Sequence, residues 1–258
     1  MRGPRKSKPV GVLSKTFQIL DLVQNSARPL NLKEISAQSG INKSTALRIL
    51  AHLEAAHYVS RNAKSEYSAG IGAPERGGAQ WHSTLRRIAR LPMWELWRST
   101  LETVNLGVLE GLEVVYLECL ESPHEFRLVA HVGMRAALHR TALGKAILAW
   151  SPVEKREMIL ETCDFEPFTP NTIRSPGVLR LRLEEIREAG YAVDDEESHL
   201  GLRCIAAPIL NAAGLAMAAI SISGPTARLS LESVRPLATE VRSAAQAIAA
   251  KAAALGLA

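Results

Sequence analysis

The sequence predicts an α+β fold in two parts, a small basic module followed by a larger domain built on an antiparallel sheet. Three observations support this prediction. Hydrophobic residues recur at helical spacing near the start of the chain, whereas short β-like runs and helices are mixed after residue 102. Residues 1–70 contain 11 Lys and Arg against 4 Asp and Glu, and residues 71–258 contain 20 against 22. A single core seldom exceeds about 250–300 residues, so a chain of 258 residues favours two domains.

The first 80 residues are expected to form three helices and a two-stranded ribbon. Residues 1–12 are predicted to be a basic arm, and Ser14 is expected to cap the first helix. Gly40 is expected to end the second helix, because glycine favours the left-handed conformation found there. Residues 70–80 contain four glycines and a proline, which predicts a linker. The predicted elements are a helix carrying Phe17, Ile19, Leu20 and Val23, helices at Leu32–Ser39 and Asn42–Ala55, and strands at Tyr58–Val59 and Tyr67 around the polar loop 61–66.

The rest of the chain is expected to alternate between helices and strands. A helix over 81–101 contains Pro92, which we expect to bend or divide it. A hairpin turn at 211–214 is predicted to join the last two strands, and the final helix carries an apolar stripe. The predicted strands are Val104–Leu109, Val114–Leu120, Arg127–Val132, Tyr191–Val193, Arg203–Leu210 and Leu215–Ser223; the predicted helices are Thr141–Trp150, Val153–Glu161, Val178–Glu188 and one with Val234, Leu237, Val241, Ala244 and Ile248.

The composition excludes several classes of protein. With 47% hydrophobic and 22% charged residues, the chain is neither disordered, collagen-like nor a coiled coil. Cys119, Cys163 and Cys204 are far apart and form no C-x-x-C pair, which argues against a disulfide framework or a zinc finger and favours a reducing cytoplasm. The basic N-terminus has no apolar stretch behind it, so we expect no signal peptide. Proline, asparagine and glycine interrupt the most apolar stretch, 204–222, which predicts strands rather than a membrane span.

The segment 32–50 has the spacing of a helix-turn-helix, a short helix and a glycine-containing turn followed by a longer helix. Such a second helix presents its N-terminal residues to the DNA major groove, where arginine can read guanine and hydroxyls can hold phosphate. The excess of positive charge in this module favours DNA over the alternative, a small helical bundle with a solvated polar face. The candidate DNA-binding residues are Lys43, Ser44, Thr45, Arg48 and His52 on the helix, and Arg61 and Lys64 on the ribbon.

The chain contains four sequence motifs. They are Leu32–Leu53, which follows L-x-E-I-A-x-x-x-G-L-x-K-S-T-x-x-R-x-L-x-x-L; 139–146, which follows H-x-T-A-L-G-K-A; the Thr172-Ile173 pair; and 190–208 together with 220–225. These motifs resemble those of the IclR family of bacterial transcriptional regulators. The resemblance covers roughly residues 12–250, and its blocks occur in the family's order.

The resemblance implies a winged helix-turn-helix domain over 1–70, a linker and linker helix over 71–101, and a GAF-like effector-binding domain over 102–258. It also implies homodimers or homotetramers on palindromic double-stranded operator DNA, with no cofactor and no membrane contact. The chain departs from the family at a few positions. Asn42 replaces a usual proline and can cap the helix instead, His57 replaces a usual glycine, the glycine usual near Leu101 is absent, and 70–78 is unusually rich in glycine.

The resemblance also implies an effector pocket for a small carboxylate metabolite. Thr141 is expected to cap a helix whose first N–H groups would face the anion. Serine hydroxyls would add hydrogen bonds, and Asp194 would accept one from a hydroxyl of the ligand. Aromatic and short aliphatic acids both remain possible. The candidate effector-binding residues are Leu128, Ala136, Ala142, Leu143, Asp194, Glu197, Cys204, Ser221 and Ser223, with Met134 beside them.

Each pocket assignment has an alternative. Cys204 could be a small core residue, the two serines could lie on a solvent-facing strand edge, and the acids at 194–197 could be solvated and pair with Arg203. Cys204 could also pair with a histidine, at 131, 139 or 199, in a cysteine-dependent enzyme. No nucleophile elbow, P-loop or dinucleotide motif supports catalysis, and the spacing of His and Cys does not favour a metal site. A protein-interaction module that has lost DNA binding is the third possibility. We therefore expect a cytoplasmic transcriptional regulator that is not an enzyme.

Overall fold

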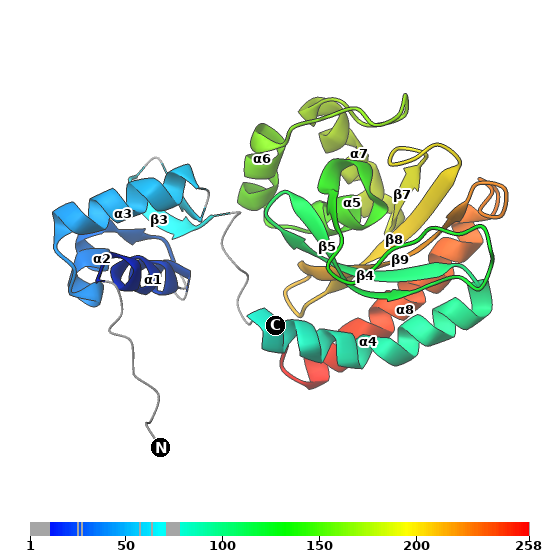
Figure 1. Ribbon diagram of the computed structural model, residues 1–258, viewed down its shortest axis with the longest axis horizontal. Coiled ribbons are helices and arrows are strands. Elements are labelled where there is room, and N and C mark those ends of the chain that lie inside the picture. Colours follow the sequence, from blue (N-terminus) through cyan, green and yellow to red (C-terminus); the bar gives the residue numbers. More distant parts are fainter. Residues whose placement is uncertain are drawn as a thin grey trace, which may run out of the picture. The chain divides into compact units, whose positions relative to one another are not determined.

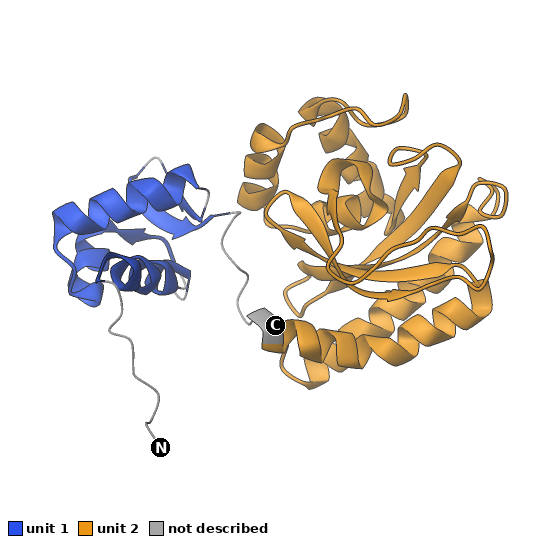
Figure 2. Ribbon diagram, viewed as in Figure 1, with its two compact units in different colours: residues 1–76 blue, residues 77–258 orange. Residues whose placement is uncertain are grey.

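The computed structural model describes residues 11–24, 26, 28–56, 58–62, 64–70 and 78–257. The chain forms two compact units, residues 1–76 and residues 77–258 (Figure 2). His57, most of the predicted basic arm and residues 71–77 of the predicted linker lie outside the described residues.

The first unit packs three helices against a small antiparallel sheet (Figure 1). The helices at 32–39 and 43–55 form as predicted, and the ribbon is confirmed, with an additional short strand, β1, beside it. Ser14 lies inside the first helix and is not its cap, because the uninterrupted run from Gly11 allows the helix to begin earlier. Phe17 is 61% exposed, so the core contact of this helix comes from Ile19, Leu20 and Val23. The elements are α1 (Gly11–Gln24), β1 (Leu30–Asn31), α2 (Leu32–Ser39), α3 (Lys43–Ala55), β2 (Val59–Arg61) and β3 (Glu66–Ala69), with the sheet order β1-β3-β2.

Side-chain caps fix the two helices of the helix-turn-helix. Asn31 accepts a hydrogen bond from the backbone N–H of Glu34 at 3.0 Å, and the Glu34 carboxylate accepts one from the N–H of Asn31 at 2.9 Å. This reciprocal pair satisfies two N–H groups that a helix start leaves without partners. Gly40 has a φ of +67° and ends α2 as predicted. Asn42 caps α3 by accepting from the N–H of Thr45 at 2.9 Å, so the residue that replaces the usual proline still starts the helix.

The second unit is a six-stranded antiparallel sheet covered on both faces by helices (Figure 1). The strand order is β6-β5-β4-β9-β8-β7. Helices α4 and α8 bury one face of the sheet, and α5 packs on the other face. The elements are α4 (Gly78–Thr100), β4 (Thr103–Glu110), β5 (Glu113–Leu120), β6 (Arg135–Ala137), the 3-10 turn η1 (Leu138–Arg140), α5 (Ala142–Ala149), α6 (Val153–Thr162), α7 (Pro176–Ala189), β7 (Ala192–Asp195), β8 (Leu202–Leu210), β9 (Ala216–Pro225) and α8 (Val234–Ala254).

One predicted strand is absent. The segment 127–132 is irregular, and Val129 and Val132 are 63% and 49% exposed. The edge of β5 is taken instead by the residues that follow, since Tyr116 donates to the carbonyl of Met134 at 2.9 Å and accepts from the N–H of Gly133 at 2.8 Å. The alternation of apolar residues that predicted the strand therefore belongs to a surface loop, and the third strand of this region is β6.

Helix α4 continues through Pro92 and is not divided there. It packs as part of the second unit, with Leu85, Ala89 and Met93 fully buried in the same core as α8. The helix ends at Thr100, and the next residue, Leu101, has a φ of +54°, in the left-handed region that glycine adopts without strain. This is the region where the family's usual glycine is absent, so the chain adopts the turn at a steric cost.

Candidate functional site

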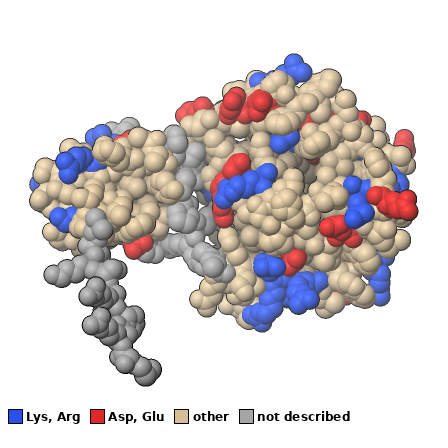
Figure 3. All heavy atoms as spheres, in the orientation of Figure 1, with Lys and Arg blue, Asp and Glu red and all other residues tan. Residues whose placement is uncertain are grey.

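The exposed face of α3 carries most of the predicted DNA-binding residues. Lys43, Ser44, Arg48 and His52 are exposed, and Thr45 is half-buried. The opposite face of α3 is buried in the core of the first unit through Ala46, Ile49, Leu50 and Leu53. The helix is therefore anchored along one side, with its polar side and its capped N-terminus left free. Figure 3 shows more Lys and Arg than Asp and Glu on the visible face of this unit.

Sequence reasoning missed an apolar residue on this exposed face. Leu47 is 46% exposed, between the lysine and arginine that we expect to contact DNA. An apolar side chain at such a position can contact the methyl group of thymine. The sequence position of Leu47 could have indicated this exposure, because Leu47 falls outside the apolar stripe that anchors α3.

The loop between β2 and β3 holds its two basic residues differently. Arg61 donates to the Ser65 hydroxyl at 2.8 Å, and its guanidinium lies 5.7 Å from the centre of the Tyr67 ring. Lys64 is exposed, and its backbone N–H donates to the Asn62 side chain at 3.0 Å. Asn62 also accepts from the N–H of Glu66 at 2.9 Å. The loop is thus shaped by Asn62, whose role the sequence did not reveal, and it displays Lys64 outward.

The predicted effector residues of the second unit converge on one pocket between the sheet and the start of α5. Eight of the nine candidates line it, together with Met134, and Glu197 does not. The cavity is narrow, with a volume of about 40 Å³. The lining residues are Tyr116, Leu128, Met134, Ala136, Arg140, Thr141, Ala142, Leu143, Asp194, Ser198, His199, Leu202, Cys204, Ser221 and Ser223.

The polar floor of the pocket is a row of residues in register across neighbouring strands. Asp194 on β7 lies opposite Cys204 on β8, which lies opposite Ser223 on β9. Ser221 is on the same side of β9, two residues earlier, and both serines are 2% exposed or less. Because β9 is an inner strand, the alternative that these serines lie on a solvent-facing edge is wrong. Asn105 of β4 supports the row by donating to Ser223 at 3.3 Å.

The N-terminus of α5 forms the opposite wall. Thr141 caps the helix as predicted, accepting from the N–H of Gly144 at 3.1 Å. The N–H groups of Ala142 and Leu143 belong to the first turn, where a helix supplies no carbonyl partner. Glycine is required at 144, because a Cβ there would lie 2.3 Å from the carbonyl oxygen of Leu138. The close approach of η1 to α5 therefore depends on the glycine at position 144.

Asp194 is buried, and both of its carboxylate oxygens are already engaged. Oδ1 accepts from the N–H groups of Glu197 and Ser198 at 2.8 and 3.2 Å, and Oδ2 accepts from the Ser198 hydroxyl at 2.6 Å. Asp194 therefore shapes the loop after β7 in addition to facing the pocket. The neighbouring Arg203 pairs with Asp195 at 2.5 Å, as the alternative for the acidic run anticipated.

Glu197 lies behind the pocket, where it forms an ion pair with Lys145 of α5. Lys145 is fully buried, and Oε2 of Glu197 is buried with no hydrogen-bond partner in the part of the chain that the structure describes. Burial raises the pKa of Glu197, and the positive charge of Lys145 opposes that shift. The pair ties α5 to the loop after β7, a role that the sequence did not reveal for either residue.

The thiol of Cys204 is poorly suited to nucleophilic chemistry. Burial raises its pKa well above the ordinary value, and the negative charge of Asp194 adds to the shift. A cysteine nucleophile needs the thiolate, so this environment disfavours the cysteine-dependent enzyme. His199 lines the same pocket, whereas His139 contacts Cys163 at 3.7 Å and His131 is exposed. Among the described residues no group of three or more His, Cys, Asp or Glu could hold a metal ion, and no described helix is long and apolar enough to cross a membrane.

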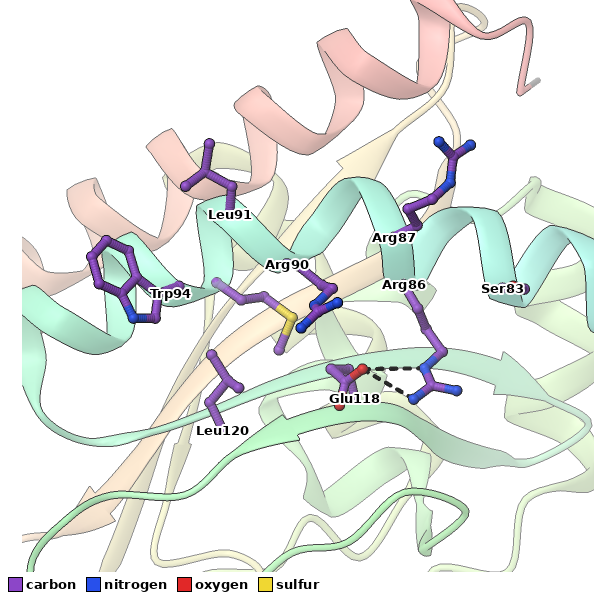
Figure 4. A pocket seen from close by; sticks show the side chains of 9 residues that line it. Ser83, Arg86, Arg87, Arg90, Leu91, Trp94, Glu118 and Leu120 are labelled. Carbon is purple, nitrogen blue, oxygen red and sulfur yellow. Dashed lines mark hydrogen bonds and ion pairs between the residues drawn. The ribbon is translucent and has the colours of Figure 1, made fainter.

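A second, larger hollow lies outside α4, away from every predicted site residue. Its volume is about 690 Å³. In Figure 4, three arginines project from α4, and Arg86 donates to Glu118 of β5 at 3.1 Å. Trp94 and Leu91 also line the hollow, and their side chains are 46% and 54% exposed. Nothing in this hollow resembles the row of buried polar groups at the effector pocket.

Comparison with known proteins identifies the family. The model for "Bacterial transcriptional regulator IclR C-terminal" matches residues 79–250, and that for the "IclR helix-turn-helix domain" matches residues 12–63. The HTH-type transcriptional regulator KdgR of Escherichia coli is 35% identical over 94% of this chain and 92% of its own.

Solved structures of similar proteins support the same family. The Thermotoga maritima IclR structure is 31% identical, with a TM-score of 0.63, covering 93% of this chain and 98% of that chain. An IclR homolog from Microbacterium hydrocarbonoxydans, solved with 4-hydroxybenzoate, is 25% identical, with a TM-score of 0.62, covering 94% and 99%. Both the helix-turn-helix unit and the unit that contains the sheet and the pocket match this family, and the chain belongs to the IclR family of bacterial transcriptional regulators.

Proposed function

We propose that this regulator binds operator DNA in a sequence-specific manner and that a small organic acid in the pocket modulates the binding. The observation that carries the proposal is the combination of an anchored, N-capped α3 in one unit with a buried polar pocket at the start of α5 in the other. A ligand can shift an equilibrium only through different affinities for two states, so the acid must bind differently to the DNA-competent and DNA-incompetent forms.

In the proposed DNA complex, α3 enters the major groove and the loop after β2 contacts the backbone. Arg48 is the candidate for reading a base, while Lys43, Ser44 and Thr45 lie at the end of the helix where phosphate contacts position the protein. His52 lies one turn beyond Arg48, and its ring Nδ1 donates to the backbone carbonyl oxygen of Arg48 at 2.7 Å, which restrains the ring. Lys64 and Arg61 are the candidates for backbone or minor-groove contacts.

The proposed active form is a homodimer, or a homotetramer of two dimers, in the cytoplasm. A twofold dimer would bind two half-sites, so the operator should be palindromic, with half-sites separated by a whole number of helical turns. The protein would act without catalysis, since its relatives are transcriptional regulators and burial raises the pKa of the Cys204 thiol, which disfavours the thiolate.

The proposed effector is a small carboxylate. The first N–H groups of α5 provide a site for an anion, the serine hydroxyls of β9 provide further hydrogen bonds, and Leu128, Met134 and Ala136 provide apolar contact. The structural relative from Microbacterium hydrocarbonoxydans holds 4-hydroxybenzoate, which is also a carboxylic acid.

The test measures binding of the purified full-length chain to fluorescent DNA duplexes from the regions upstream of its own and adjacent genes, with and without a panel of small carboxylic acids. We expect salt-dependent binding to one palindromic duplex, and a changed affinity in the presence of at least one acid. Equal affinity for all duplexes would refute sequence-specific recognition. An affinity that no acid alters would refute the sensor role.

A further inference from the structure

Arg140 is a charged residue of the pocket that the motifs did not single out. It is the last residue of η1, directly before the cap of α5, at the variable position of the H-x-T-A-L-G-K-A motif. Its guanidinium carbon lies 3.4 Å from the centre of the Phe168 ring, which is 48% exposed. The guanidinium is therefore held over an aromatic ring at the rim of the pocket, whereas Cys204 and Ser223 lie deep inside it.

The hydrogen-bonding groups of this guanidinium are unused. Nε is buried, and no hydrogen bond or ion pair joins the side chain to another residue within the described part of the chain. Burial lowers the pKa of Arg140, while the negative charge of Asp194 opposes the shift. Arginine nevertheless stays protonated in proteins and offers five N–H donors in a planar fork. A partly buried, unpaired guanidinium beside a cavity is suited to a carboxylate, which can accept two of these hydrogen bonds at once.

The net charge of the pocket limits what it can bind. Among the groups that line it, Arg140 contributes one positive charge and Asp194 one negative charge, so their sum is zero. The Lys145–Glu197 pair behind the pocket also sums to zero. The remaining attraction for an anion comes from the N-terminus of α5, equivalent to about half a positive charge. A monoanion is therefore stabilised, whereas a dianion would add a second negative charge near the buried Asp194, and the described lining holds no lysine and no second arginine to offset it.

We propose that Arg140 binds the carboxylate of the effector and, balanced by Asp194, restricts the pocket to acids with a single negative charge. This inference rests on the proposed function, in that it assigns the ligand class of the same pocket. Phe168 acts as a positioning residue, because its ring holds the guanidinium in place at the rim. The selectivity for monocarboxylates over dicarboxylates is a property of the two opposed charges rather than of the size of the cavity.

The test uses three probes with four carbons each, which differ mainly in charge: butyrate, butyramide and succinate. The affinities of the full-length protein and its variants are measured by isothermal titration calorimetry, and contact with Arg140 is followed by the ¹⁵N resonance of its Nε–H group, which is assigned by its loss in Arg140→Lys. We expect butyrate to shift this signal saturably, butyramide to leave it in place, and succinate to bind more weakly than butyrate. In Arg140→Gln the butyrate affinity should fall at least about tenfold, as expected for losing a charge-assisted hydrogen bond.

Two further variants separate the charge argument from a structural effect. Arg235→Gln is the matched control, because Arg235 is exposed on α8, on the other face of the sheet, and it should leave all three affinities unchanged. Asp194→Asn keeps the shape and the acceptor for the backbone N–H groups but removes the negative charge, so it should raise the affinity for succinate relative to butyrate. The thermal unfolding of each variant, measured without ligand, shows whether it is folded.

The proposal is overturned if butyramide binds as tightly as butyrate, if Arg140→Gln binds butyrate like the wild type, or if none of the probes binds up to its solubility. An unchanged succinate preference in folded Asp194→Asn would overturn the charge-balance part. These outcomes are independent of the DNA assay. Butyrate could bind through Arg140 while no acid alters DNA affinity, in which case the proposed function fails and the assignment of Arg140 stands.

Discussion

Replacing Lys145 by methionine should destabilise the second unit strongly and in a pH-dependent manner. The methionine fills a similar volume, so the main effect is that Glu197 loses its ion-pair partner while it stays buried. Removing one partner of a buried ion pair costs about 3–5 kcal/mol. The upper part of this range is expected here, because the second oxygen of Glu197 already has no hydrogen-bond partner among the described residues.

The pH dependence follows from the direction of the pKa shift. Burial raises the pKa of Glu197 in the folded protein, and removing Lys145 removes the charge that opposes this. Between the unfolded and the folded pKa, the folded state then binds more protons than the unfolded state, so stability falls as pH rises through that window. The variant should therefore lose least stability below about pH 4, under the ordinary glutamate pKa of about 4.3, where Glu197 becomes protonated in both states, and more at about pH 8.

Urea unfolding followed by tryptophan fluorescence measures this effect selectively. All four tryptophans, at positions 81, 94, 97 and 150, lie in the second unit, so the first unit does not contribute to the signal. The control is the double variant with Glu197→Gln, which removes the orphaned charge and should recover at least half of the loss. A cost below about 1 kcal/mol at pH 8, or an equal cost at both pH values, would refute the account of a buried and electrostatically coupled pair.

Three other substitutions test the remaining assignments. Arg48→Ala should weaken operator binding by about 1–3 kcal/mol, which is a factor of about five to 150, while butyrate binding stays unchanged; equal loss on all DNA sequences would contradict base reading. Asn42→Ala removes the cap of α3 and should lower stability of the first unit by about 1 kcal/mol, measured by far-UV circular dichroism, and Asn42→Ser should restore most of it. Gly144→Ala places a methyl group against the backbone of η1 and should abolish the Arg140 response to butyrate or unfold the second unit, whereas Gly177→Ala, in open space, should do neither.

Local signals predicted most of the secondary structure correctly. The caps at Asn42 and Thr141, the left-handed Gly40 and the stripe on α8 depend on residues close together in sequence, and the structure confirms each one. The errors arose where tertiary pairing decided the outcome. Residues 127–132 alternate like a strand, but β5 pairs with the segment after them.

The candidate pocket was predicted through the family motifs. The lining residues that this prediction missed were missed for one physical reason. Tyr116, Arg140 and the adjacent pair Ser198 and His199 reach the pocket from three separate places in the chain, so no local spacing relates the three places. The burial of Lys145 was equally hidden, because a lysine in a short helix normally predicts a solvent-facing side. Only the fold shows that this helix has no such side.

The lack of a solvent-facing side on α5 has a mechanical consequence. All eight residues of α5 are buried, and interiors this closely packed deform little without repacking their neighbours. The wall of the pocket formed by α5 therefore behaves as a fixed reference against which a bound acid is held. Any adjustment that makes room for the acid must occur at the rim, in the loops that carry Leu128, Phe168 and Ser198, and we expect the change that alters DNA binding to begin there.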